Sequence, residues 1–253
     1  MLQTQDGSER ASTAVLFIHG FLGSPRQFQY LEPVVRSCGC DAYALLLPGH
    51  GGTLGDFVRA GRTQWQAHVL REVERLRAEY DNILLVGHSM GCLLAVQAAL
   101  RDPSSIRGIL ALALPLYMRV SATGIQINWR YVTGRMRKQD ERLKAAKEFC
   151  GVSGLFLWNA VRMLPRILDV LYMTQQSRAQ IMKLRVPLSV VHSPGDEWVS
   201  RRTLAFAQKR LRDADIIQLS ESGHFWYADV DRQTIQNKLA RLLQRDGASI
   251  SSN

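Results

Sequence analysis

One segment of the chain restricts its fold more than any other. Residues 83–99 read ILLVGHSMGCLLAVQAA, an apolar run that ends at Gly87 and an Ala- and Leu-rich run that follows Ser89. The first run predicts a buried strand and the second a helix, so the serine stands at the turn between them. Glycines two residues before and after it let strand and helix approach, and such a turn strains the serine backbone and lifts its hydroxyl above the sheet. The pattern predicts a nucleophile at Ser89; the alternative is an ordinary tight turn without chemistry.

Apolar runs alternate with helical patterns along most of the chain. Helical spacing of apolar residues predicts helices from Pro25 to Val35, over residues 62–80, after Ser89 and around residues 235–243. Between them, short apolar runs predict six strands, at residues 14–19, 41–47, 83–87, 109–114, 188–192 and 215–219. Apolar strands separated by helices favour an α/β fold, with a mostly parallel sheet covered by helices on both faces.

Residues 115–183 interrupt this alternation because no strand is expected there, over a length that far exceeds an ordinary connection. The segment starts with a basic stretch, 130–147, and continues with apolar residues at helical spacing that Pro165 is expected to divide into two helices. We expect a helical cap at 115–183, inserted into a core formed by residues 1–114 and 184–253.

A serine nucleophile needs a base and an acid, and both are expected beyond the insertion. Asp196 follows the strand predicted at 188–192, and His224 follows the one at 215–219. Parallel strands build their sites at their carboxyl ends, so both residues should reach the serine. His224 would accept the serine proton, because an imidazole titrates near neutral pH, and Asp196 would hold its tautomer. Glu197, the neighbour of Asp196, competes for the role of the acid, and the sequence alone leaves both open.

The remaining histidines favour structural roles. His88 adjoins the serine but should point away from it and pack under the turn, whereas His19 is expected to brace a loop. His50 and His192 are typical of turn and core positions, and His68 lies on an exposed helix. No histidine pair has metal-ligand spacing and no H-E-x-x-H motif occurs, so neither a metal nor another cofactor is expected.

Several short motifs together resemble the α/β-hydrolase superfamily, most closely its bacterial carboxylesterase and monoacylglycerol lipase group. They are His19-Gly20-Phe21, Leu47-Pro48-Gly49-His50-Gly51, the serine turn, Asp196 and Ser222-Gly223-His224. The resemblance implies an oxyanion hole made by the main-chain N–H groups of Phe21 and Met90, the latter at a helix N-terminus. Because few residues precede the first strand, the family's opening antiparallel pair has no counterpart, and we expect six or seven strands.

The substrate is predicted less directly. Apolar side chains of the insertion, together with Trp158, Trp198 and Trp226, suit a pocket for a fatty acyl or aromatic group, unless they only pack the cap onto the core. We therefore expect a serine carboxylesterase or monoacylglycerol-lipase-like enzyme that acts on a small acyl ester. The alternatives are a thioesterase or acyl transferase with the same nucleophile, and a non-catalytic protein that binds an apolar ligand.

The net charge of +10 favours anionic partners, and part of it lies in the stretch 130–147. This stretch can be a solvated helix face, a peripheral contact with an anionic membrane, or a site for a negatively charged group. Nucleic acid is not expected, because no binding module accompanies the charge. The polar N-terminal residues lack a secretory pattern and the four cysteines lack disulfide spacing, so we expect a reduced, cytoplasmic protein.

Overall fold

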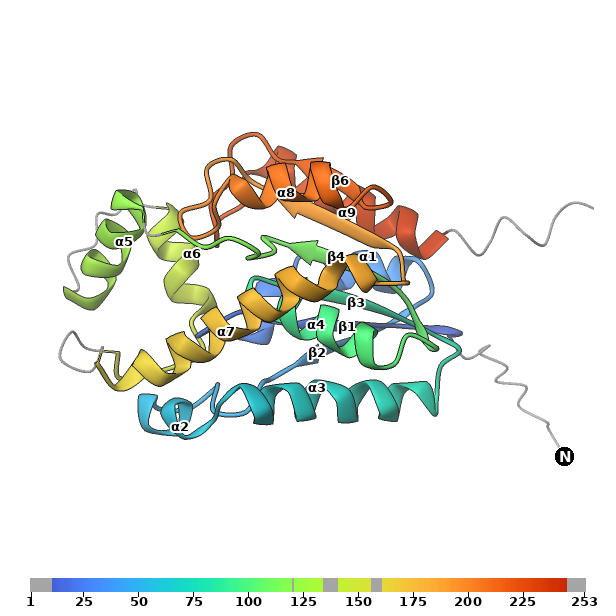
Figure 1. The fold of residues 1–253 in the computed structure, drawn as a ribbon, viewed down its shortest axis with the longest axis horizontal. Helices are drawn as coiled ribbons and strands as arrows, with labels where there is room; N and C mark the ends of the chain where they lie inside the picture. Colours follow the sequence, from blue (N-terminus) through green and yellow to red (C-terminus); the bar gives the residue numbers. More distant parts are fainter. Residues whose placement is uncertain (1–10, 120, 134–140, 156–160, 245–253) are drawn as a thin grey trace, which may run out of the picture.

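A computed structural model describes residues 11–119, 121–133, 141–155 and 161–244 (Figure 1). Its centre is a six-stranded sheet in the order β2-β1-β3-β4-β5-β6, and every neighbouring pair is parallel. The strands are β1 (Thr13–Ile18), β2 (Asp41–Leu45), β3 (Asn82–His88), β4 (Ile106–Leu112), β5 (Leu188–His192) and β6 (Asp215–Gln218). Each lies within a few residues of its predicted position, and the predicted fold class is confirmed.

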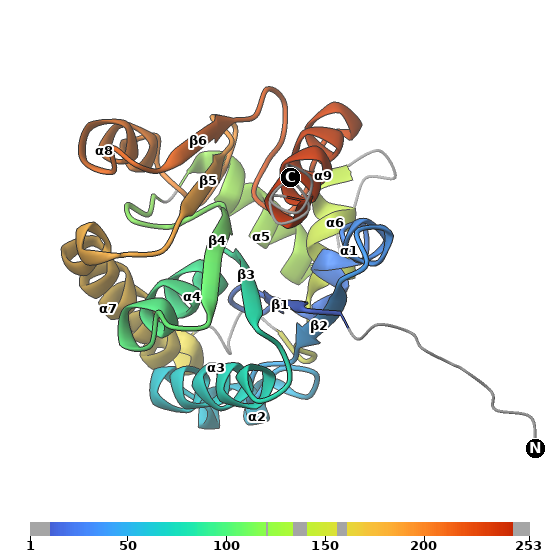
Figure 2. The same cartoon turned by 90° about the vertical axis from the view of Figure 1, so that its right-hand side faces the viewer.

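Helices cover both faces of the sheet (Figure 2). One face carries α3 (Arg62–Arg77), α4 (Met90–Arg101), α7 (Leu164–Gln180) and α8 (Arg202–Arg210), and the other carries α1 (Glu32–Ser37) and α9 (Asp229–Gln244). Alternate residues of β1 enter the two cores: Leu16 and Ile18 pack toward α3 and α4, whereas Phe17 packs toward α1 and α9. This alternation follows from the two-residue period of a strand, and it explains why strands buried on both faces are apolar throughout.

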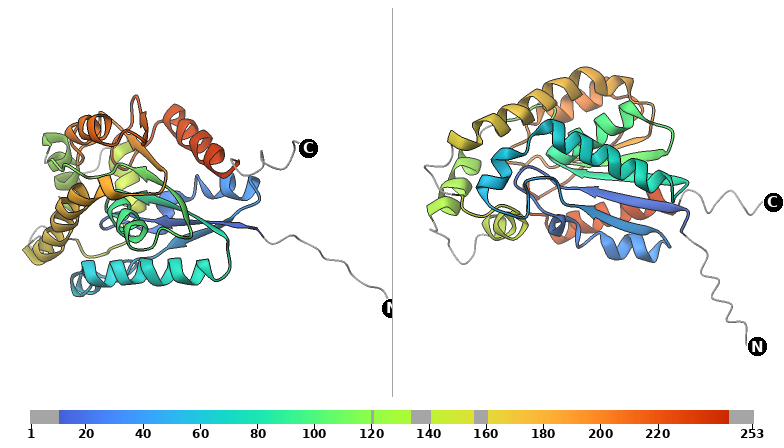
Figure 3. Two further views of the ribbon diagram at one scale, coloured as in Figure 1. Left: turned by 45° about the vertical axis from the view of Figure 1, so that its right-hand side comes forward. Right: turned by 90° about the horizontal axis from the view of Figure 1, so that it is seen from below.

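The stretch between β4 and β5 contains α5 (Ala122–Thr133), α6 (Glu141–Phe149), α7 and the 3₁₀ turn η3 (Ile181–Lys183). Within its described residues it adds no strand to the sheet. Helices α5 and α6 lie beyond the carboxyl ends of the strands (Figures 1 and 3). Pro165 occupies the first turn of α7, where its missing N–H breaks no helical hydrogen bond. The helix expected before Pro165 falls largely on residues 156–160, outside the described part of the chain.

Two details of the helices differ from the sequence-based expectation. The helix expected from Pro25 to Val35 is divided into the 3₁₀ turn η1 (Pro25–Phe28) and α1. Two helices were not expected, α2 (Leu54–Arg59) and α8. A signal for α2 does exist: Thr53 and Asp56 form a capping box, in which each side chain accepts the other's main-chain N–H.

None of the helices in the described part of the chain combines the length and apolar character that crossing a lipid bilayer requires.

Candidate active site

The turn between β3 and α4 holds Ser89 in a strained conformation, with φ 51° and ψ −118°. Both glycines of the motif are required by close packing. A Cβ on Gly87 would lie 2.6 Å from the main-chain nitrogen of Cys92, and a Cβ on Gly91 would overlap the carbonyl oxygen of Ile18. Non-glycine residues rarely adopt such a φ, and they do so where the surrounding structure holds them. Here that structure places the serine hydroxyl at the carboxyl edge of the sheet.

Three side chains from separate loops meet at this edge. Nε2 of His224 lies 3.1 Å from Oγ of Ser89, and Nδ1 of His224 lies 2.8 Å from Oδ2 of Asp196. His224 follows β6 and Asp196 follows β5, so parallel strands bring together residues that lie 135 positions apart in the chain. The three predicted residues therefore form a continuous hydrogen-bonded chain from a carboxylate to a serine hydroxyl.

The environment of Asp196 keeps its carboxyl group ionised. Burial raises its pKa, but the neighbouring His224, the hydrogen bond from that ring, and the main-chain N–H groups of Val199 and Trp198 outweigh burial, so the pKa lies below its usual value. An ionised carboxylate only accepts hydrogen bonds, so Nδ1 of His224 must carry the proton. Nε2 is then left with a lone pair that faces the Ser89 hydroxyl.

The competing acid, Glu197, lies close to the same histidine but contacts its main chain. Oε2 of Glu197 accepts the main-chain N–H of His224 at 2.8 Å, and the other oxygen pairs with Arg142 of α6. The glutamate is buried, with 3% of its surface exposed. Asp196 therefore binds the imidazole ring of His224, whereas Glu197 binds its main-chain N–H. The sequence contains no signal for this second role, since Arg142 and Glu197 lie 55 positions apart.

The loop that carries His224 is held from two further sides. Nε2 of His88 donates to the His224 carbonyl oxygen at 2.9 Å, and burial, the largest influence, lowers the pKa of His88 to about 3, so its ring is neutral. The carboxylate of Asp231, in α9, accepts the main-chain N–H groups of three consecutive residues, Ser220, Glu221 and Ser222. His88 thus packs under the turn, where the sequence analysis placed it.

Two main-chain donors lie beside the serine. Among the described residues, neither the N–H of Phe21 nor that of Met90 has an acceptor. Gly20, next to Phe21, packs so closely that a Cβ there would lie 3.1 Å from Cβ of Ser89. His19 braces this loop: its Nε2 accepts the N–H of Leu47 at 3.1 Å, so its Nδ1–H donates to the Gly20 carbonyl. The two N–H groups that the sequence predicts for an oxyanion hole are thus free to bind one.

Residues 149–153, which follow α6 and are called the strap below, hydrogen-bond to the loop that contains Phe21. The N–H of Gly151 donates to the carbonyl of Leu22 at 2.8 Å, and the carbonyl of Gly151 accepts the N–H of Gly51. Leu22 has a positive φ of 56°, and a Cβ on Gly151 would overlap the carbonyl of Gly23. Two residues along the strap, the N–H of Ser153 donates to the carbonyl of Gly52 at 2.9 Å. The strap therefore meets the main chain next to Phe21.

The three predicted pocket tryptophans have different outcomes. Trp158 lies outside the described residues. Trp198 is half-buried beside α5, since a Cβ on Gly124 would lie 3.4 Å from its ring. Trp226 is also half-buried, and its ring centre lies 5.9 Å from the guanidinium of Arg142. The structure thus places two of the three between the loops of Asp196 and His224 and the helices of the insertion.

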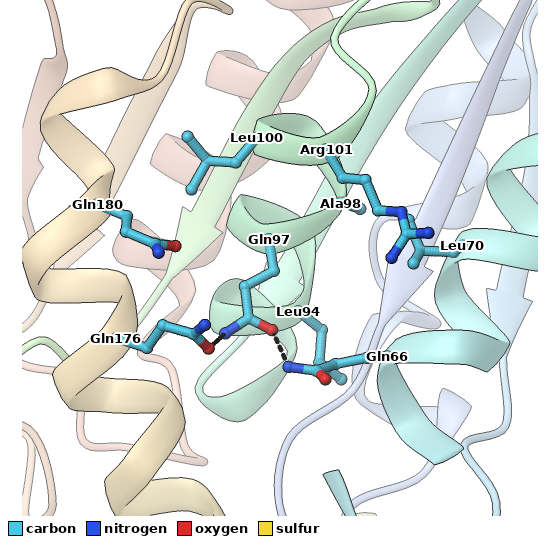
Figure 4. A pocket seen from close by; sticks show the side chains of 9 residues that line it. All are labelled: Gln66, Leu70, Leu94, Gln97, Ala98, Leu100, Arg101, Gln176 and Gln180. Carbon is cyan, nitrogen blue, oxygen red and sulfur yellow. Dashed lines mark hydrogen bonds between the residues drawn. The ribbon is translucent and has the colours of Figure 1, made fainter. Parts of the chain in front are cut away.

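A separate groove of about 290 Å³ lies between α3, α4 and α7 (Figure 4). Its polar side chains mostly bind one another: Gln66 donates to Gln97, which donates to Gln176 at 2.9 Å. No serine, histidine or acidic residue lines it. Within the described residues, no group of three or more His, Cys, Asp or Glu side chains could hold a metal ion.

The comparison with protein families decides the membership of the chain. The model of the alpha/beta hydrolase family matches residues 15–236, a range that includes Ser89, Asp196 and His224. The chain belongs to the α/β-hydrolase family. The predicted resemblance is thereby confirmed.

Relatives within the α/β-hydrolase family agree with this assignment. A carboxylesterase of Bacillus subtilis (strain 168) is 23% identical over 242 residues, which cover 92% of both chains. A thermostable monoacylglycerol lipase of Bacillus sp. (strain H-257) is 28% identical over 118 residues, 47% of each chain. Among solved structures, a metagenome-derived lipolytic enzyme, from a study of LipS and LipT, has a TM-score of 0.73 at 19% identity and covers 96% of this chain and 100% of its own.

Proposed function

We propose that the protein is a serine hydrolase that cleaves carboxylic esters through an acyl-enzyme. The observation that carries the proposal is the position of the His224 imidazole. It lies between the hydroxyl of Ser89, whose backbone is strained, and a buried, ionised carboxylate. A serine hydroxyl is a weak nucleophile unless a base removes its proton during attack, and this arrangement supplies the base in the required tautomer. The names of the carboxylesterase and lipase relatives support an ester as the substrate.

In this proposal, Oγ of Ser89 attacks the carbonyl carbon of the ester while Nε2 of His224 takes the hydroxyl proton. The carbonyl oxygen becomes an oxyanion and accepts hydrogen bonds from the main-chain N–H groups of Phe21 and Met90. Asp196 stabilises the imidazolium that forms. His224 then returns its proton to the departing alcohol, which leaves an acyl-serine. A water molecule attacks this ester by the same steps, and the acid and free Ser89 are released.

We further propose that residues 115–183 act as a cap on a core of residues 1–114 and 184–253. Contacts at the acid loop support this role: Arg119 donates to the carbonyl of Asp196, and the hydroxyl of Ser121 donates to that of Glu197 at 2.8 Å. Trp198 and Trp226 face the same helices, so they are suited to wall an apolar acyl pocket beneath the cap.

Hydrolysis of p-nitrophenyl esters from acetate to palmitate tests the proposed reaction. We expect activity that peaks at one chain length, because a pocket enclosed by the cap gains apolar contact with each methylene until it is full. The initial rate is measured for each ester, with Ser89→Ala as the blank. Labelling by a fluorophosphonate without hydrolysis of any ester would favour a thioesterase or acyl transferase. Neither labelling nor hydrolysis would favour a non-catalytic protein that binds an apolar ligand.

A peripheral contact with an anionic membrane is part of the same proposal. A row of apolar side chains on α7 and just before it is exposed, namely Val161 (78% exposed), Leu164, Leu168, Leu171 and Tyr172. An apolar row on a protein of net charge +10 suits the surface of an anionic bilayer.

A cytoplasmic location is also proposed, and the four free cysteines support it, because disulfides are rare in the reducing cytoplasm.

Co-sedimentation with vesicles tests the membrane contact. We expect binding to vesicles that contain phosphatidylserine and weaker binding to phosphatidylcholine alone. Leu168→Glu should weaken binding about 10-fold, because it removes one apolar side chain from the lipid contact. The control is Val230→Glu, which adds the same charge at an exposed apolar position on α9. Equal loss in both variants, or no binding by the wild type, would contradict this part of the proposal.

A further inference from the structure

A buried ion pair connects the insertion to the loop of His224. The side chain of Glu197 is 4% exposed; one oxygen pairs with Nη1 of Arg142, and the other accepts the main-chain N–H of His224 at 2.8 Å. Arg142 belongs to α6, far along the chain from both partners, and its Nη1 also lies 3.5 Å from the carbonyl oxygen of Gly195. The contact therefore runs from an insertion helix, through one carboxylate, to the backbone of the histidine.

The main chain of His224 is held on both sides by hydrogen bonds that do not involve its own ring. Glu197 binds its N–H, and His88 binds its carbonyl oxygen at 2.9 Å. The ring itself contacts Asp196 and Ser89, and its position follows from the backbone that carries it. Since proton transfer requires a well-aligned hydrogen bond, a small displacement of this backbone lowers the rate of the chemical step.

Glu197 depends on Arg142 to remain a strong acceptor. A carboxylate this deeply buried is costly without a cation, so loss of the guanidinium would lead Glu197 to bind water in its place. Water that competes for the same carboxylate oxygens, without the guanidinium to fix them, weakens its hold on the His224 N–H. The arginine also packs against the ring of Trp226, which keeps its guanidinium oriented.

We propose that Arg142, through Glu197, is a positioning residue for His224, so that helix α6 of the insertion sets the geometry of the general base. The inference rests on the proposed ester hydrolase function and adds two residues to it. It also gives the insertion a part in the chemistry that is separate from walling a pocket.

The proposal predicts opposite electrostatic effects for the two partners. Asp196, Glu197 and His88 contact His224 directly. The charged and titratable groups around these partners are His192 and Arg119, which lie near Asp196, and Arg142, which pairs with Glu197. Arg142→Met removes a positive charge from this set and should move the acidic limb of the kcat/KM pH profile to higher pH. Glu197→Gln removes a negative charge and should move this limb to lower pH.

The test measures kcat, KM and the acidic limb of the kcat/KM pH profile on a soluble p-nitrophenyl ester. Arg142→Met should lower kcat about 10- to 100-fold with little change in KM, and move the limb to higher pH by about half a unit or more. Glu197→Gln should also lower kcat but move the limb to lower pH. Arg142→Lys keeps the charge and should recover part of kcat with the limb near its wild-type position. Lys144→Met, two residues away on α6, removes a charge whose one ion-pair partner among the described residues is exposed Glu141, and it should change nothing.

The double variant Arg142→Met/Glu197→Gln keeps the test informative if either single variant fails to fold, because it buries no unpaired charge. It should show the wild-type limb with a reduced kcat. If the variants lower only the melting temperature, or move the limb in the same direction, the positioning role is refuted. A wild type that neither hydrolyses esters nor reacts with a fluorophosphonate would instead refute the proposed function, and the positioning role would fall with it.

Discussion

Replacement of Ser89 by alanine is expected to lower kcat/KM for ester hydrolysis by about 10⁴-fold or more, while the fold stays intact. In the proposed mechanism the hydroxyl forms the acyl-enzyme, so its loss would remove the covalent route and leave only binding and the proposed oxyanion donors. The neighbouring strand and helix hold residue 89 at its positive φ of 51°. The smaller alanine side chain fits the same turn, so the variant should keep this backbone. Steady-state rates and fluorophosphonate labelling measure the effect, and far-UV circular dichroism checks the fold.

The matched control is Ser104→Ala, at an exposed serine whose hydroxyl, within the described part of the chain, donates to Asp102 alone. It should retain wild-type rates and labelling. If Ser89→Ala still reacts with the probe at the wild-type rate, the nucleophile is another residue.

Replacement of Asp196 by asparagine is expected to lower kcat by about 10⁴-fold, because it reverses the tautomer of His224. Oδ1 of Asp196 accepts two main-chain N–H groups, from Trp198 and Val199, each at 2.7 Å. An asparagine must keep its carbonyl oxygen there, and its NH₂ group then points at Nδ1 of His224. That nitrogen becomes an acceptor, the proton moves to Nε2, and the ring cannot take the proton of Ser89. The measurement is kcat across the pH range in which the wild type is active.

Two further variants make the result specific. Asp213→Asn, at an exposed aspartate, should behave as the wild type. Glu197→Gln should lose about 10- to 100-fold, clearly less than Asp196→Asn, since Glu197 holds only the backbone. The reverse order of the two losses would make Glu197 the acid.

The four inner strands were predictable from the sequence because they are buried on both faces and read as mostly apolar runs. Residues 188–192 match β5 at both ends, and the other strands differ by up to three residues at an end. The positions of Ser89, Asp196 and His224 follow from the same reasoning, since parallel strands deliver the residues after them to one edge of the sheet. The structure brings the three within hydrogen-bond distance, and their roles in catalysis stay predictions.

Features that depend on contacts between distant residues could not be predicted in this way. The short helix α2 has too few residues for a clear apolar period, and only its capping box marks it. The ion pair of Arg142 with Glu197 joins an exposed-looking basic stretch to a buried turn, and no local pattern reveals such a pairing. The exposure of Leu168 was also hidden, because an apolar row at helical spacing reads as core in sequence.

The strap at residues 149–153 has a consequence for the engineering of this enzyme class. To change the preferred acyl chain length, one would exchange the residues that line the acyl pocket between relatives. The simplest such exchange would replace the whole insertion, residues 115–183. Replacing the whole insertion would remove Gly151, whose N–H binds the carbonyl of the strained Leu22, one residue from the proposed oxyanion donor Phe21. A graft that ends inside the strap would therefore alter selectivity and disable the chemistry at once. Exchanges confined to α5, or to the segment between the strap and α7, leave that attachment in place.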